Sequence, residues 1–468
     1  MAGVLTPQEE DFPRWYQEVI AKAQLAENGP VRGTMVIRPW GYAIWERLEA
    51  AIDDRIKATG ARNAYFPLLI PEAFLRREAE HVEGFSPELA VVTHGGGKAL
   101  EEPAVVRPTS ETIVNSSFAR WISSYRDLPL LINQWANVVR WELRPRLFIR
   151  TSEFLWQEGH TAHATRDEAH AYALRILEDV YADAMSEELA IPVFRGRKTE
   201  REKFAGAEIS WSCEGIMRDG KALQMGTSHE LGQNFARVFG IRFSDRDGQL
   251  RHVWQTSWGV STRLLGAMIM VHGDDHGLRV PPRLAPTQAV VMTARAGEGV
   301  LDAATTLVED LRRHAVRVEL DERLELSLGR RIVDHELRGV PLRIELGPRE
   351  LQAGEAVVAR RVRSSKERVT LGDLPARVPQ MLREDQQELL MQATALRDER
   401  THCAQTLEDA IQIGSTGFAR IRWRDCGHGD EDRLAEAGLS VRCLLRADGQ
   451  PVNDPDDPAV EALLARAY

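Results

Sequence analysis

Two strand-like runs joined by a short basic loop, over residues 130–160, constrain this chain more than any other stretch. Leu130–Glu142 and Phe148–His160 are rich in β-branched and aromatic residues, which favour strands. The loop between them carries Arg144 and Arg146. The pattern predicts two neighbouring strands with a basic tip, so a sheet built around this pair is expected to organise the chain.

Strand alternation groups charged and aromatic side chains on shared faces. Ionised groups on a half-buried face are costly unless something neutralises them. Internal ion pairs, such as Arg140 with Glu158, would do so. A ligand carrying both charges, such as an amino acid together with a nucleotide phosphate, would do so as well. The first run places Arg140 and Glu142 on one face, and the second places Arg150, Phe154, Trp156, Glu158 and His160 on one face.

The sequence of these two runs resembles motif 2 of the class II aminoacyl-tRNA synthetases. This resemblance favours a charged ligand over internal ion pairs. The matching residues are Arg140-Trp-Glu142 and, after a loop, Arg150-Thr-Ser-Glu-Phe-Leu-Trp-Gln-Glu-Gly-His160. They are most similar to prolyl-tRNA synthetases of the archaeal/eukaryotic-like type. The resemblance implies an α+β chain: a class II antiparallel-sheet catalytic domain over residues 1–286, an α/β anticodon-binding domain over 287–375 and a small α/β C-terminal module over 376–468.

Length and composition are compatible with this organisation. The 468 residues can hold two or three domains, and a net charge of −10 argues against general nucleic-acid affinity while leaving room for a local basic track. The longest apolar run, Leu264–Val271, is too short to span a bilayer, and Met1–Glu10 carries no secretory signal. Four widely spaced cysteines imply no disulfide framework. We therefore expect a cytoplasmic protein without membrane contact.

Residues 42–71 read as a helix followed by an extended segment. Tyr42–Ala58 has helical periodicity, and Asn63–Pro71 follows it as an extended segment. Within this segment a strand is predicted to end at Pro67. Proline within a strand favours an edge position. A plain helix–strand unit explains these residues, but they also resemble motif 1, which builds the dimer interface of class II synthetases. The resemblance implies a homodimer.

Arg107-Pro-Thr-Ser-Glu-Thr112 is predicted to open a helix. Thr109 or Ser110 could cap it, with Glu111 favoured in the first turn by the helix dipole. In the resembled family this turn holds the imino group of the substrate. The resemblance therefore implies that Thr109 and Glu111 bind proline.

Two later segments carry further matches. Asp219-Gly220 between apolar runs predicts a hairpin, and the run that follows resembles the family's A-L-Q-x-G-T-S-H strand. Thr256–Gly266 resembles motif 3, whose arginine, here Arg263, holds the γ-phosphate of ATP. An arginine beside apolar helix residues needs an anionic partner to be tolerated.

The resemblance implies two groups of site residues around ATP and its Mg²⁺. Arg140 and Arg263 are the expected catalytic residues, with Arg140 bridging the amino-acid carboxylate and the α-phosphate. No general base is required, because the carboxylate is already the nucleophile, so catalysis is positioning plus charge stabilisation. Trp156, Phe204 and Trp258 are expected to form an apolar wall. The proline set is Thr109, Glu111, Arg140, Trp156, Glu158, Phe204, His229, Ser257, Trp258 and Gly259. The ATP set is Arg140, Glu142, Arg150, Thr151, Gln224, Thr227 and Arg263.

Beyond the Pro281–Pro286 linker, strands and helices alternate, which is typical of a small α/β domain. Gly339–Arg349 is similar to the anticodon-binding domain of several class II synthetases. Glu345 and Arg349 are therefore assigned to tRNA binding, as are Arg144 and Arg146 at the acceptor end. The family's usual Arg-Asp pair is Arg361-Val362 here, which is expected to alter anticodon contacts if that aspartate reads a base.

The last part of the chain is predicted to contain one long helix over residues 376–412 and short strands at 420–423 and 441–445. The resembled family often binds zinc here through four cysteines, but only Cys426 and Cys443 match. We therefore predict no metal and a module held together by packing.

The implied function is ATP-dependent activation of L-proline and its transfer to the 3′ end of tRNA(Pro), which is a ligase reaction of protein biosynthesis. Two alternatives are a synthetase-like paralogue, which adenylates proline for another carrier or serves as a resistance copy, and a non-catalytic amino-acid sensor. The presence of Arg140, Glu142, Arg150 and Arg263 argues against the sensor, whereas Val362 and the missing cysteines leave the paralogue open.

Overall fold

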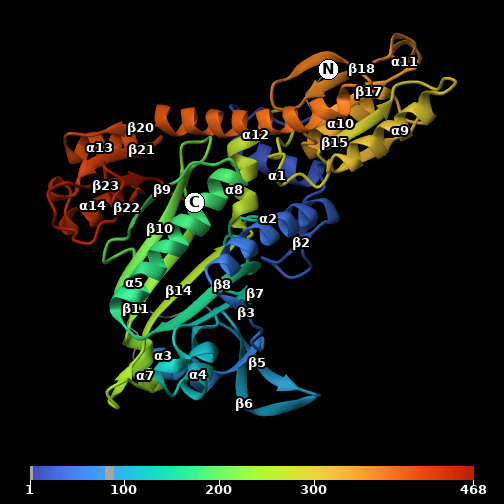
Figure 1. The fold of residues 1–468 in the computed structure, drawn as a ribbon. Coiled ribbons are helices and arrows are strands. Elements are labelled where there is room, and N and C mark those ends of the chain that lie inside the picture. The colour runs from blue at the N-terminus through green and yellow to red at the C-terminus, as the bar shows by residue number, and fades with distance from the viewer. Residues whose placement is uncertain (1–3, 80–88) are drawn as a thin grey trace.

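A central sheet organises the structure, a computed structural model that describes residues 4–79 and 89–468 (Figure 1). Its strand order is β20-β21-β23-β22-β9-β10-β11-β14-β8-β7-β3, and from β9 to β7 every neighbouring pair is antiparallel. The expected antiparallel catalytic sheet is thereby confirmed. Its strands are β7 (Leu130–Val139), β8 (Glu153–His163), β9 (Phe194–Arg197), β10 (Ile209–Ile216), β11 (Ala222–Gly232) and β14 (Trp254–Ser261), with β3 (Arg62–Asn63) parallel to β7 at the edge.

The β7–β8 pair is shorter than its sequence suggested. β7 ends at Val139 and β8 begins at Glu153, so Arg140, Glu142 and Arg150 lie in the connecting segment instead of on strands. The amide of Arg140 still donates to the carbonyl of Ser152 at 2.8 Å, which extends the β7–β8 ladder by one bond. The ladder ends there because the amide of Ser152 donates to the carbonyl of Gly33 at 2.7 Å instead of to β7.

One face of the sheet is covered by helices that form the largest apolar core. Buried side chains spaced along α2, including Ile44, Leu48 and Ile52, pack into this core together with side chains from the helices after β8. These helices are α1 (Phe12–Lys22), α2 (Pro39–Ala58), α5 (Arg166–Arg175), the π-helix η2 (Ile176–Ala182), α6 (Asp183–Glu187) and α8 (Arg263–His272).

Smaller elements complete the catalytic part of the structure. The expected strand ending at Pro67 is wrong, because residues 64–68 form an irregular connection between two short strands. The elements are β1 (Ala26–Asn28), β2 (Met35–Ile37), β4 (Leu69–Pro71), α3 (Glu72–Ala79), β5 (Ala90–Gly95), β6 (Lys98–Val106), α4 (Glu111–Trp121), η1 (Tyr125–Asp127), α7 (Asn234–Phe239), β12 (Arg242–Ser244) and β13 (Leu250–His252).

The predicted α/β domain has its own sheet, in the order β16-β15-β17-β18-β19, and its own apolar core. The first turns of the following helix α12 supply Leu374, Val378 and Met381 to this core. The elements are β15 (Ala289–Thr293), α9 (Val300–Arg313), β16 (Val318–Asp321), α10 (Leu328–Arg338), β17 (Leu342–Leu346), α11 (Pro348–Ala353), β18 (Glu355–Arg360) and β19 (Ser365–Thr370).

The C-terminal module continues the catalytic sheet. α12 spans from the second domain to this module (Figure 1) and ends at Glu399, so the helix expected over 376–412 is wrong. Thr406 caps a new helix instead, because its side chain accepts from the amide of Asp409. β22 pairs with β9 through Leu444 and Arg197, which joins the two sheets. The elements are α12 (Leu374–Glu399), β20 (Thr401–Cys403), α13 (Leu407–Gly414), β21 (Phe418–Arg422), η3 (Trp423–Asp425), η4 (His428–Asp430), α14 (Glu431–Glu436), β22 (Ser440–Arg446) and β23 (Val460–Ala465).

The two cysteines matched to the family's zinc site lie in apolar surroundings. Cys426 packs with Leu434 in one cluster, and Cys443 packs with Leu463 in another. Burial raises the pKa of each thiol to about 12. The module is therefore packed on apolar side chains around both cysteines. Within residues 4–79 and 89–468, none of the helices is long and apolar enough to cross a membrane.

Val362 belongs to the interface between the second domain and the catalytic part. It is buried in a cluster with Ala190 and Leu389, and its neighbour Arg361 forms an ion pair with Asp274. Val362, which stands where the family usually has the aspartate of its Arg-Asp pair, therefore packs in a contact between the two domains.

We expect acid to weaken the catalytic part through His272. This side chain is buried and donates to the carbonyl of Leu189 at 2.7 Å, and burial lowers its pKa to about 3. Because the folded pKa lies below the unfolded value of about 6.5, stability is full above pH 6.5 and falls as the pH drops toward 3. The loss is about 2 kcal/mol at pH 5.

His272→Gln should lose less stability than the wild type between pH 7.5 and pH 5 in urea denaturation. The exposed His402→Gln serves as the matched control. Equal losses in wild type and His272→Gln would contradict the assignment.

Candidate active site

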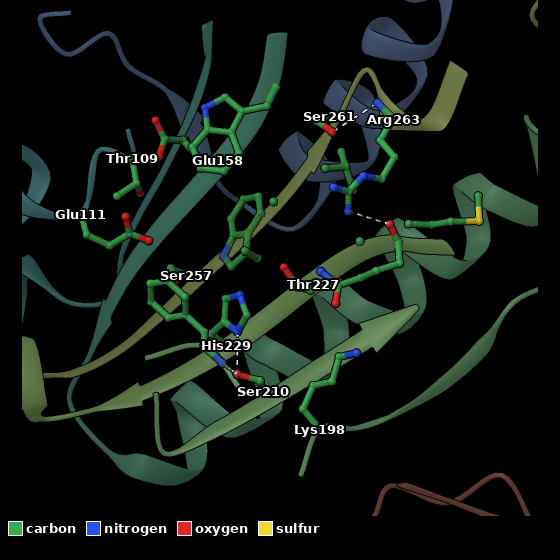
Figure 2. Close-up of a pocket in the computed structure, with 18 of the residues that line it drawn as sticks. Thr109, Glu111, Glu158, Lys198, Ser210, Thr227, His229, Ser257, Ser261 and Arg263 are labelled. Atoms are coloured by element: carbon green, nitrogen blue, oxygen red, sulfur yellow. Dashed lines mark hydrogen bonds between the residues drawn. The ribbon is translucent and has the colours of Figure 1, made fainter. Parts of the chain in front are cut away.

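A cavity of about 260 Å³ lies on the face of the sheet opposite the large core, and it contains every member of the predicted proline set. The register places side chains in rows across three strands. Glu158 in β8 pairs with Gly259 in β14, which pairs with Thr227 in β11. His160, Ser257 and His229 form the next row. Figure 2 shows Thr109, Glu111 and Glu158 at one side of the cavity and Arg263 with Ser261 at another.

A second cavity of about 190 Å³ adjoins the first and shares Arg140 and Arg263 with it. It brings together Glu142, Arg150 and Thr151, which come from the segment between β7 and β8. Gln224 and Thr227 line the first cavity. The predicted ATP set therefore surrounds one continuous region, with Arg140 and Arg263 at the junction.

Glu158 is a fixed anion at one end of the cavity. It accepts from the amide of Ser110 at 3.1 Å, from the Ser110 hydroxyl, from Gln134 Nε2 at 3.0 Å and from His160 Nε2 at 3.2 Å. Burial raises the pKa of Glu158, but the bonds from His160, Ser110 and Gln134 outweigh it, so the pKa is lowered overall. Ser110 occupies the cap position of α4 without capping it. The capping explanation for this serine is therefore wrong.

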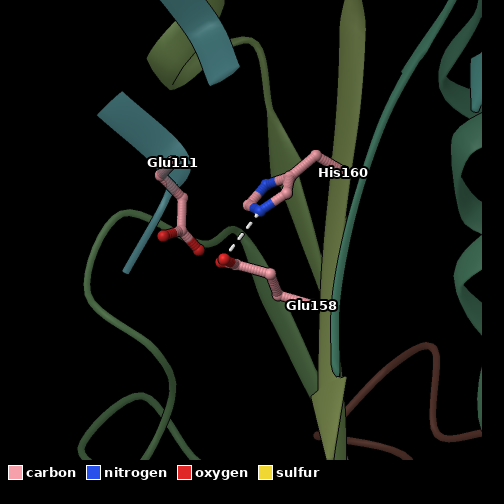
Figure 3. A group of neighbouring side chains, drawn as sticks. All are labelled: Glu111, Glu158 and His160. Carbon is pink, nitrogen blue, oxygen red and sulfur yellow. Dashed lines mark hydrogen bonds and ion pairs between the residues drawn. The ribbon is translucent and has the colours of Figure 1, made fainter. Parts of the chain in front are cut away.

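Glu111 is a less saturated carboxylate beside Glu158. Its Oε2 is buried and has no hydrogen-bond partner among the described residues, and the same holds for Thr109 Oγ1. Burial raises the pKa of Glu111, the charge of Glu158 adds to the rise, and His160 opposes it. Figure 3 shows Glu111, Glu158 and His160 converging, with one ligand atom from each lying within 4.8 Å of the others. Such a corner suits a cationic hydrogen-bond donor.

The expected ion pair between Arg140 and Glu158 does not form in the described structure. The Nε of Arg140 donates to the carbonyl of Pro108 at 2.9 Å, and its guanidinium lies 5.7 Å from the ring centroid of Phe154 and 5.3 Å from that of Trp156. Burial lowers the pKa of Arg140, and the charges of Glu111 and Glu158 oppose this. Arg140 thus keeps much of its donor capacity for a ligand.

Arg263 begins α8, and among the described residues its guanidinium has only carbonyl partners, namely Ile149 at 3.2 Å and Gln224 at 3.4 Å. Burial lowers its pKa to about 10, and repulsion from Arg140 and Arg150 adds to this. Only Arg150 has a carboxylate partner, Glu142, at 2.9 Å. Arginines gathered around one cavity suit an anion of several charges, because arginine binds phosphate or carboxylate in a bidentate manner.

The apolar wall differs from the expectation in one member. Trp258 faces the helices, where its ring lies 6.4 Å from that of Tyr172 and directly over Gly159, so only its backbone borders the cavity. Trp156 faces the cavity, and Phe204 packs at 4.9 Å from the ring of His229. We therefore assign the wall to Trp156, Phe204 and His229.

His229 is a neutral part of this wall. Its Nδ1 is hydrogen-bonded to Ser210 Oγ at 2.8 Å, and Ser210 Oγ also accepts from the amide of Phe204 at 3.0 Å. Burial lowers the pKa of His229 to about 3, and the charge of Lys198 adds to this. Sequence patterns did not point to Lys198 or Ser210. Lys198 donates to the carbonyl of Arg442, far away in the chain, and Ser210 meets His229 only through the register of β10 with β11.

The residues assigned to tRNA lie outside the cavity. Arg144 is exposed between β7 and β8, and Arg146 lies 5.2 Å from the ring centroid of Tyr468. In the second domain, Glu345 is ion-paired with Arg343 at 3.0 Å and Lys366 at 3.1 Å, and Arg349 is exposed.

Comparisons with known proteins match two parts of the chain to family models. Residues 97–272 match the tRNA synthetase class II core domain (G, H, P, S and T), and residues 288–381 match an anticodon binding domain. The chain is 61% identical to a proline–tRNA ligase of Frankia alni, with both sequences covered to 100%. It is 58% identical to proline–tRNA ligase 2 of Streptomyces avermitilis, covering 100% of this chain and 99% of the relative. A crystal structure of prolyl-tRNA synthetase from Cryptosporidium parvum, complexed with halofuginone and AMPPNP, is 37% identical, with a TM-score of 0.94 over 100% of this chain and 99% of that one.

Proposed function

The chain belongs to the prolyl-tRNA synthetases, and from this premise we propose how its cavity carries out the family's reaction. The enzyme activates L-proline with ATP to prolyl-adenylate and transfers the prolyl group to the 3′ end of tRNA(Pro). The observation that supports the site assignment best is charge separation within one cavity. Glu111 and Glu158 lie at one end, Arg263 lies toward the other (Figure 2), and Arg140 lines both this cavity and the adjoining one.

Proline carries a secondary ammonium, a carboxylate and a small apolar ring, and the cavity offers a counterpart for each. We assign the ammonium to Glu111 Oε2 and Thr109 Oγ1, which have no hydrogen-bond partner in the described residues. Glu158 keeps the turn before α4 in place through Ser110. The ring fits against Trp156 and Phe204, with Ser257 and Gly259 as the floor. Because methylene-sized differences discriminate by only about 1–3 kcal/mol, the ammonium contacts must supply much of the recognition.

Activation joins two anions. One carboxylate oxygen of proline attacks the α-phosphorus of ATP, the bond from this phosphorus to the bridging oxygen breaks, and pyrophosphate leaves with both bonding electrons. Arg140 contacts both the carboxylate and the α-phosphate, and Arg263 draws the γ-phosphate away. ATP enters as its Mg²⁺ complex. Glu142, Arg150, Thr151, Gln224 and Thr227 orient the nucleotide. Arginines suit this role because they stay charged and cannot compete as nucleophiles.

The second half-reaction uses the adenylate as the acyl donor. A terminal ribose hydroxyl of tRNA(Pro) attacks the prolyl carbonyl, and AMP leaves. Arg144 and Arg146 lie where the acceptor end would approach, and their charge suits phosphates. Glu345 and Arg349 are our candidates for anticodon contacts in the second domain.

We also infer a homodimer in the cytoplasm. Large apolar side chains are exposed after α2 and at the end of α4, namely Tyr65, Leu69 and Trp121, and they offer a surface for a second copy. All four cysteines are free, as suits a reducing compartment.

Proline-dependent exchange of pyrophosphate into ATP, followed by charging of tRNA(Pro), tests the assignment. We expect both activities from the full chain. Exchange without charging would favour the paralogue that serves another carrier, and absence of both would favour the sensor. Alanine in place of proline is the control substrate for specificity.

A further inference from the structure

A buried ion cluster connects the C-terminal module to the wall of the cavity. Lys198, which lines the cavity just after β9, donates through Nζ to Glu214 Oε1 at 2.8 Å and to the carbonyl of Arg442 at 2.6 Å. Arg442 in β22 donates through Nε and Nη2 to Glu214 Oε2 at 3.1 and 3.0 Å. The three side chains are 3%, 0% and 9% exposed, so the module reaches the cavity through one buried carboxylate.

The next residues are tied to the same module. Thr199 Oγ1 donates to Glu431 Oε1 at 2.6 Å, and Arg201 forms an ion pair with Asp432. The segment from 198 then runs to Phe204, whose ring packs against His229 and whose amide is held by Ser210. The outer support of the Phe204 wall is therefore contributed by residues more than 200 positions later in the chain. We name Lys198, Thr199, Glu214, Glu431 and Arg442 the module clasp.

Stability alone is a weak explanation for the clasp. Buried ion pairs gain little over apolar packing, because desolvation offsets most of the attraction. Here two cations share one carboxylate, and the pKa of Glu214 is lowered because Arg442 and Lys198 outweigh the effect of burial. The arrangement fixes geometry, because Arg442 donates twice to Glu214 Oε2 while Lys198 donates to Oε1, so the two carboxylate oxygens are held by different residues.

We propose that Arg442 and Glu431 are positioning residues for the proline end of the active site. They hold residues 198–204 so that Phe204 closes against His229, and they act through Glu214, Lys198 and Thr199 without touching substrate. The proposal rests on the function proposed above, since it names this pocket as the proline site. It makes the C-terminal module a determinant of proline affinity in addition to a packing unit.

The test compares Arg442→Met with Arg442→Lys, Thr199→Val and a matched control, Arg420→Met. Arg420 also forms an ion pair in the module, with Glu461, but on the β21–β23 pair away from the clasp. In pyrophosphate exchange we expect Arg442→Met to raise the KM for proline about tenfold and to leave the KM for ATP within about twofold. Arg442→Lys should restore it to within about threefold. Thr199→Val, which buries no unpaired cation, should raise the KM for proline by about threefold.

Hydrogen exchange over residues 198–207 separates this proposal from the assignment of function, because it requires no turnover. Faster exchange there in Arg442→Met and Thr199→Val, with Arg420→Met unchanged, supports the clasp. Unchanged exchange overturns it even if the wild type is active. Parallel rises in the KM for proline and for ATP would also overturn it, since they would indicate a general loss of structure.

Discussion

Replacing Arg140 with alanine is expected to lower kcat/KM in proline-dependent pyrophosphate exchange by about 10²–10³-fold, the usual effect of removing a preorganised charge that meets the transition state. The reason is the position of its guanidinium between the carboxylate end and the cationic end of the cavity. Its protein contacts are one carbonyl and two aromatic rings, so it is held in place without being neutralised.

The fold should survive this change. Arg140 is an exposed residue whose guanidinium donates one hydrogen bond, to the carbonyl of Pro108. We therefore expect the unfolding midpoint of Arg140→Ala to stay close to that of the wild type. Arg140→Lys should recover little activity, because an ammonium cannot span carboxylate and phosphate as a planar guanidinium does.

Arg107→Ala is the contrasting control. Arg107 is buried, and it donates to the carbonyl of Phe66 at 2.6 Å, the carbonyl of Asn137 at 2.8 Å and Asn137 Oδ1 at 3.0 Å. Its removal leaves buried acceptors unpaired at about 1–3 kcal/mol each, so stability should fall first. Exchange activity within tenfold of the wild type in Arg140→Ala would refute the catalytic assignment.

Local patterns predicted the site where side chains alternate along strands. Phe154, Trp156, Glu158 and His160 share a face because strands have a period of two, and the structure places all four on the cavity. The same rule predicts that the side chain of Trp258 points away from the cavity. Ser257 and Gly259 face the cavity, so the residue between them must face the helices.

Contacts between distant segments could not be predicted in this way. The β7–β8 pairing ends because Gly33 takes the amide of Ser152, and nothing in residues 130–142 indicates this. Ser110 has the residue type of a helix cap, yet its hydroxyl donates a hydrogen bond to Glu158 in β8 instead of capping α4. Lys198 likewise could not be assigned from its sequence neighbours, because it donates to the carbonyl of Arg442, 244 positions later in the chain.

Replacing Glu111 with glutamine is expected to raise the KM for proline at least about 30-fold at neutral pH. The loss of one partner from a buried charge pair costs about 2–5 kcal/mol, and the proline ammonium would face a neutral amide. Thr109 would remain as the acceptor. The KM for ATP should change little, because the nucleotide contacts lie at the other end of the cavity.

The same substitution should stabilise the enzyme without ligand. Burial raises the pKa of Glu111 in the folded state, so the folded protein holds this proton to a higher pH than the unfolded chain does. Stability from this group is therefore full below the unfolded pKa and is lost as the pH rises through the folded value. Glu111→Gln removes that loss. Its denaturation midpoint should exceed that of the wild type at pH 8, and the two should converge in acid.

The pH profile of kcat/KM for proline connects the two effects. Proline binding needs the ionised carboxylate, so wild-type kcat/KM should fall as the pH drops through the raised pKa of Glu111, whereas Glu111→Gln should be low and flat over that window. A wild-type profile that the substitution leaves unchanged in shape would assign the titration to another group. A variant that is stabilised but still binds proline normally would remove Glu111 from the ammonium site. A carboxylate that is unfavourable in the empty pocket and required in the occupied one is what substrate recognition by charge predicts, because proline supplies the missing counter-charge.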